Sequence, residues 1–267
     1  MAIANALAFL LYLCCSVILI RGFVKRDTSR PVKSLPIGIM TILALVFHAA
    51  HLFFVMHAAG GWDLNLMTML SITAWIMAFL AFLGGFRWPD SPPGIIVYPL
   101  VALILMMVFE VPSASNKQLQ DPALEWHILL SITAYSLLML AAIQAIVLAI
   151  QEKQLRQHHA GGLLRKLPPM QTMERGLFQL IISGFALLTL GLITGFVFVE
   201  NFWAQHLAHK TILSVIAWGV FAGLLWGRQQ HGWRGQTAVR WTLAGFAFLL
   251  LAYVGSKIVV EYILQIS

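Results

Sequence analysis

The sequence predicts an all-α protein: a polytopic membrane helix bundle of about eight transmembrane helices, with both termini outside. Three observations lead to this fold class. The chain of 267 residues is 60% hydrophobic and only 10% charged, whereas a soluble domain has about a quarter of its residues charged. Its apolar residues gather in eight long stretches. Its positive charge falls almost entirely on one side of those stretches.

Each apolar stretch is long enough to cross a bilayer, because a helix needs about 20 apolar residues to do so. The first stretch has a basic segment after it and none before it, which is typical of an outward-starting helix rather than a cleaved signal. We therefore expect a single integral membrane domain over residues 1–267. The predicted spans cover residues 2–23, 36–58, 65–86, 93–110, 124–150, 175–199, 209–227 and 236–263.

The basic residues fix the predicted orientation. The net charge is +7, and of the 17 Lys and Arg residues only Lys117, Lys210 and Lys257 lie outside the first, third, fifth and seventh connections and their helix edges. Short loops rich in Lys and Arg stay in the cytoplasm. This distribution indicates contact with the anionic inner leaflet rather than with nucleic acid.

The connections differ in character. The fifth, residues 151–173, begins with a polar continuation of its span, then has Gly161-Gly162 and Pro168-Pro169, which end a helix and stiffen a turn. The outward loop over residues 200–210 is short, aromatic and rich in histidine. This loop and the helix starts beside it are therefore the first place to look for chemistry.

His48 lies in the middle of the second span. A polar side chain at that depth must be satisfied inside the protein, which makes His48 a candidate for cofactor binding. The alternative is a structural histidine that is hydrogen-bonded to a neighbouring helix. The sequence leaves both interpretations open.

Two further histidines start different helices on the predicted outer side: His127 in the fifth span and His209 in the seventh. Neutral imidazoles from facing helices can hold a haem (heme) iron between them. In this interpretation both histidines are iron ligands. Trp126 and Trp203 would flank the porphyrin, and Lys210 would meet a propionate as a point charge.

The residues around these histidines resemble a known family. Residues 126–136, Trp-His-Ile-Leu-Leu-Ser-Ile-Thr-Ala-Tyr-Ser, are similar to the helix start His-Val-x-x-x-x-x-Ser-Tyr-Ala of the CcsA/CcmC cytochrome c assembly superfamily. The nearest branch is the YpjD-like one, which is also related to HemX. The resemblance covers nearly the whole chain, with a core at about 64–264. The other segments that carry it are residues 190–195, 209–218, 232–235 and 252–256.

The resemblance implies that haem is held near the outer surface, because the better-known members deliver it there to apocytochrome c. By position His127 matches the family's first external haem histidine, Lys210 a lysine after its tryptophan-rich motif, and His48 a histidine of the YpjD-like branch. That motif, Trp-Gly-x-x-Trp-x-Trp-Asp, is replaced here by Phe-Trp-Ala-Gln-His-Leu-Ala-His at residues 202–209. The family's second external histidine, on the last helix, is absent. We therefore expect His209 to be the second iron ligand.

These observations together predict a haem-binding protein of the bacterial inner (cytoplasmic) membrane that handles or senses haem at the outer face. We expect no enzyme activity, since no nucleophile–base pair, phosphate loop or zinc-protease motif is visible. The expected partners are haem, the lipid bilayer, and cytochrome c assembly or haem-synthesis proteins. Two alternatives remain: a transporter of a small solute or metal ion, and a regulatory or interaction subunit without haem.

Overall fold

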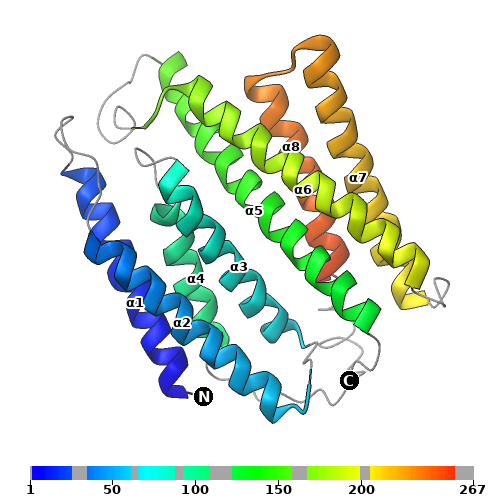
Figure 1. Cartoon of the computed structure of the whole chain (residues 1–267). Coiled ribbons are helices and arrows are strands. Elements are labelled where there is room, and N and C mark those ends of the chain that lie inside the picture. The colour runs from blue at the N-terminus through cyan, green and yellow to red at the C-terminus, as the bar shows by residue number, and fades with distance from the viewer. Residues whose placement is uncertain are drawn as a thin grey trace. The chain divides into compact units, whose positions relative to one another are not determined.

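The structure is a computed structural model that describes residues 2–25, 35–61, 65–87, 93–108, 122–157, 167–198 and 205–255. Within these ranges the regular elements are helices, which Figure 1 labels. The elements are α1 (Ala2–Val24), α2 (Leu35–Ala58), α3 (Leu66–Arg87), α4 (Gly94–Val108), α5 (Pro122–Arg156), α6 (Met170–Phe198), α7 (Gln205–His231), α8 (Gly235–Leu250) and the π-helical turn η2 (Leu251–Gly255).

These helices confirm the predicted fold class. In the described part of the chain α1, α2, α3, α5, α6 and α7 are long and apolar enough to cross a membrane. Helix α4 is shorter, at 15 residues, and contains Pro99. Helix α8 has 16 residues and continues directly into η2. The end of the eighth predicted span, residues 256–263, lies outside the described residues.

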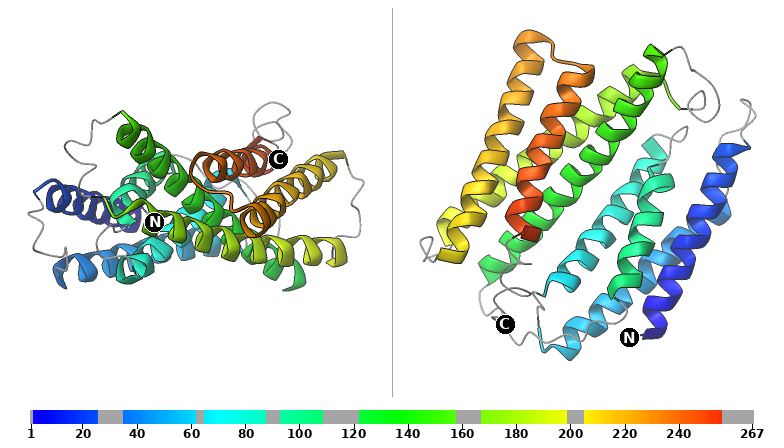
Figure 2. Two further views of the ribbon diagram at one scale, coloured as in Figure 1. Left: turned by 90° about the horizontal axis from the view of Figure 1, so that it is seen from above. Right: turned by 180° about the vertical axis from the view of Figure 1, so that it is seen from behind.

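The chain divides into two compact units. The N-terminal unit carries α1 to α4, and the C-terminal unit carries α5 to α8 with η2. In each unit consecutive helices run antiparallel, as the two views in Figure 2 show. The single domain predicted over residues 1–267 stays a prediction, so each unit is described by itself.

In the N-terminal unit α1 packs on α2 and α4, and α3 packs on α4 and α2. Two hydrogen bonds of polar side chains join neighbouring helices of this unit, where a hydrocarbon environment offers no water as a partner. Asn5 Nδ2 donates to the carbonyl oxygen of Leu105 at 3.2 Å and so joins α1 to α4. Trp75 Nε1 donates to the carbonyl oxygen of Leu45 at 2.9 Å and joins α3 to α2.

In the C-terminal unit α5 packs along α6 and α8, while α7 packs on α8 and α6. The close pairing of α5 with α6 depends on glycine. A Cβ atom built on Gly184 would lie 2.7 Å from Cγ of Leu138, closer than real Cβ contacts. Small residues let membrane helices approach in this way.

The predicted inner end of the C-terminal unit is held by ion pairs. Arg228 donates to Glu174 at 2.6 Å and to the carbonyl oxygen of Trp233 at 3.1 Å, and its guanidinium lies 4.4 Å from the ring centroid of Phe178. Glu152 accepts from Arg156 at 2.7 Å. The polar continuation of the fifth span is therefore helical as far as Arg156, where α5 ends.

Candidate functional site

The candidate site is built around His127, on the second turn of α5 at the predicted outer end of the C-terminal unit. Its imidazole is half-buried and faces the last turns of α6. The ring nitrogen Nδ1 lies 3.1 Å from Oγ1 of Thr194, within hydrogen-bond distance. This contact engages Nδ1 and does not involve the other ring nitrogen, Nε2.

Two glycines of α6 set how closely this helix approaches His127. A Cβ atom built on Gly195 would lie 3.0 Å from Cε1 of His127, and one on Gly191 would lie 3.3 Å from Oγ of Ser131. Both distances are tighter than ordinary Cβ contacts. The imidazole therefore rests on the bare backbone of α6, where any larger residue would push it away.

A line of polar side chains continues from His127 along α5. His127, Ser131 and Tyr135 are spaced four residues apart and so share one helix face. The Tyr135 hydroxyl lies 3.4 Å from Oγ of Ser214 on α7, and its ring centroid lies 5.7 Å from that of Tyr253 in η2. A π-helical turn such as η2 is often found at functional sites.

Sequence reasoning gave no role to Thr194, Tyr135, Ser214 or Tyr253. A signal for them was present, because each is a polar residue inside an apolar span and Tyr135 lies on the His127 face. The pairing of these residues across helices was not readable from the sequence. It depends on the register between α5, α6 and α7.

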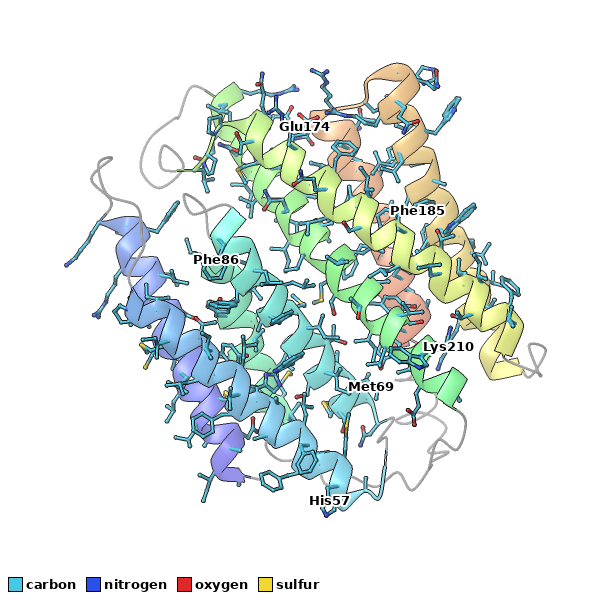
Figure 3. The ribbon with its side chains drawn as sticks, in the orientation of Figure 1. His57, Met69, Phe86, Glu174, Phe185 and Lys210 are labelled. Atoms are coloured by element: carbon cyan, nitrogen blue, oxygen red, sulfur yellow. The ribbon has the colours of Figure 1, made fainter. Side chains whose placement is uncertain are left out.

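The other predicted site residues of this unit fall in different places. Trp126 is 67% exposed on the surface of its unit. Lys210 is half-buried near the start of α7, at the predicted outer end of this unit, where Figure 3 labels it. Trp203 lies outside the described residues. His209 lies in the first turns of α7, but its side chain is outside the described part, so its pairing with His127 stays a prediction.

His48 occupies the core of the N-terminal unit. Its side chain is completely buried, with Nε2 lying 3.0 Å from Oγ of Ser71 on α3. The ring of Tyr12 from α1 meets the imidazole edge-on, with centroids 5.9 Å apart and an angle of 82° between the planes. Within the described ranges, Nδ1 of His48 and the hydroxyl of Tyr12 have no hydrogen-bond partner.

Comparisons with known proteins agree with this architecture. The family described as "Cytochrome C assembly protein" matches residues 3–264, which extends the resemblance to the start of α1. The chain is 32% identical to the inner membrane protein YpjD of Escherichia coli K12 over 231 residues, covering 84% of this chain and 86% of YpjD. It is also 32% identical over 223 residues to a 28.8 kDa protein of Azospirillum brasilense, covering 77% of this chain and 79% of that protein.

A shorter similarity reaches the cytochrome c biogenesis protein CcsA of Gloeobacter violaceus, 32% identical over 98 residues, covering 36% of this chain and 29% of CcsA. No solved structure matches the chain. With its several membrane-spanning helices and its similarity to YpjD, the protein is a multi-pass protein of the bacterial inner membrane. The chain belongs to the cytochrome c assembly protein family, in its YpjD-like branch.

Proposed function

We propose that this membrane protein of cytochrome c biogenesis type binds haem at the predicted outer end of its C-terminal unit, where His127 would hold the iron. The observation that carries the proposal is which nitrogen of the His127 ring is hydrogen-bonded. The hydrogen bond to Thr194 uses Nδ1 and does not involve Nε2. An imidazole held through one nitrogen, with the second available, is the usual arrangement of a metal-binding histidine.

The residues predicted from the sequence to surround His127 suit the same group. Haem is an anionic, flat macrocycle whose iron takes imidazole ligands, and helix bundles hold it with side chains from facing helices. Within this proposal His209 would supply the second ligand, and Lys210 would pair with a propionate. Trp126 and Trp203 would flank the porphyrin. The bound haem would supply redox chemistry or serve as cargo, while the protein holds and orients it.

His48 is the other histidine predicted to contact haem, and its surroundings support the proposal less well. The imidazole is enclosed on all sides, and Tyr12 packs on its edge. A porphyrin could reach it only after these side chains had moved apart. We therefore place the haem on His127 and give His48 a structural role that joins α2 to α3.

The proposal is tested by titrating the purified protein in detergent with hemin and recording the Soret band. We expect saturable uptake by the unmodified protein and loss of that uptake in His127→Ala. The matched control is His57→Ala, because His57 is an exposed histidine of the N-terminal unit that could bind hemin only non-specifically. Absence of uptake by the unmodified protein, or equal uptake by all three proteins, would contradict the proposal.

A further inference from the structure

We propose that Thr194 is a positioning residue that fixes the tautomer of His127, so that Nδ1 carries the proton and Nε2 presents its lone pair. The effect of this tautomer on iron binding rests on the proposed function. The tautomer itself is a property of the protein without haem. Thr194 need not touch the haem in this scheme, since it acts through the imidazole.

The argument begins with the single proton of the Thr194 hydroxyl. Oγ1 lies 3.0 Å from the carbonyl oxygen of Leu190 and 3.0 Å from that of Gly191. A carbonyl oxygen can only accept, so this geometry directs the hydroxyl proton to the α6 backbone. Toward His127, 3.1 Å away, the hydroxyl oxygen must then act as an acceptor.

The donor of that second bond is therefore the N–H group at Nδ1. In a neutral imidazole only one nitrogen carries a proton. A proton on Nδ1 leaves Nε2 unprotonated, and a metal ion binds the lone pair of such a nitrogen. The opposite tautomer would need the hydroxyl proton turned toward Nδ1, away from both carbonyl oxygens.

A second threonine on α6, Thr189, also bonds to a backbone carbonyl and to a ring nitrogen. In this case the ring nitrogen can only be the donor. The Thr189 hydroxyl donates to the carbonyl oxygen of Phe185 at 2.8 Å and accepts from Nε1 of Trp218 at 2.9 Å. An indole N–H can only donate, so Thr189 must accept on that side. Helix α6 therefore uses a threonine twice to receive a ring N–H from a neighbouring helix, once from α7 and once from α5.

The close approach of Gly195 limits where the imidazole of His127 can lie. A Cβ atom at that position would press on Cε1, the carbon between the two nitrogens. Position and protonation of His127 are thus both set by one short segment of α6, Gly191 to Gly195.

The first experiment reads the tautomer without haem. The full-length protein, labelled with ¹⁵N-histidine and free of haem, is studied by NMR in detergent at a pH where the imidazole is neutral. Subtraction of the His127→Asn spectrum identifies the His127 signals. We expect a protonated Nδ1 and an unprotonated Nε2, and a mixture of tautomers in Thr194→Val. A protonated Nε2 in the unmodified protein would overturn the inference.

The second experiment uses hemin. Loss of the hydrogen bond that orients a metal-binding histidine weakens metal affinity by roughly 10- to 100-fold. We expect Thr194→Val to weaken hemin binding by that factor and to raise the midpoint potential of bound haem, because a less basic imidazole favours ferrous iron. Thr194→Ser should restore both properties, since it keeps the hydroxyl.

The matched control is Thr189→Val, which removes an equivalent hydroxyl that serves Trp218 instead. We expect it to leave hemin affinity and midpoint potential unchanged. Equal effects of Thr194→Val and Thr189→Val in correctly folded proteins would overturn the inference. If the unmodified protein takes up no hemin, the proposed function fails, and the NMR spectrum alone still decides the tautomer.

Discussion

His48 and His127 are both intramembrane histidines bonded to a hydroxyl, yet their surroundings are opposite. His48 is fully enclosed in the N-terminal unit and engages Ser71 through Nε2. His127 is half-buried in the C-terminal unit and engages Thr194 through Nδ1. In our proposal, depth in the membrane does not distinguish the structural histidine from the ligand. The burial of the ring and the nitrogen that is engaged make that distinction.

The largest effect on stability is expected from His48→Ala. The substitution removes a buried ring and leaves the Ser71 hydroxyl without its partner, so we expect a loss of about 3 kcal/mol in unfolding free energy. Unfolding in detergent, followed by tryptophan fluorescence, measures this loss. Hemin uptake per folded molecule should not change. A folded His48→Ala protein without a Soret band would indicate that the haem binds in the N-terminal unit.

The next largest effect is expected on hemin affinity, from a substitution beside His127. Gly195→Val should push the imidazole aside, because even a Cβ atom there would lie 3.0 Å from Cε1. We expect hemin affinity to fall by at least about tenfold, the range seen when an orienting contact is lost. Gly219→Val is the matched control, since a Cβ atom on Gly219 meets nothing within 4 Å. Equal hemin affinity in the two variants would show that α6 does not position the ring.

The smallest effect is expected from Ser71→Ala. It leaves His48 buried without a partner for Nε2, so the unfolding free energy should fall by about 1 kcal/mol. The haem spectrum should stay as it is in the unmodified protein. This result would contrast with Thr194→Val, whose main effect is on haem affinity and potential. A shift of the Soret band in Ser71→Ala would show that His48, like His127, contributes to the haem site.

The helices were largely predictable from the sequence, because apolar length alone identifies a membrane span. The ends of the helices were less predictable. Helix α6 begins at Met170, five residues before the predicted start at 175, and α7 continues to His231. These extra turns are polar and are stabilised by pairs such as Glu174 with Arg228. A window of apolar residues detects the hydrocarbon core and not the helix that continues beyond it.

The site was only partly predictable. His127 was identified from its place at a helix start and from the family resemblance. Its partner Thr194 was not, since the two residues are 67 positions apart and meet only through the packing of α5 on α6. Gly184, Gly191 and Gly195 set that packing, and their spacing gave a general signal for close helices. It did not indicate which residue of α5 would face which residue of α6.

The most direct test of the account is chemical rescue of His127→Gly. This variant removes the proposed ligand and leaves room for free imidazole at the same place. We predict that the purified variant takes up no hemin alone and recovers the Soret band when imidazole is added. Full hemin uptake by His127→Gly without imidazole would contradict the central claim that His127 holds the iron.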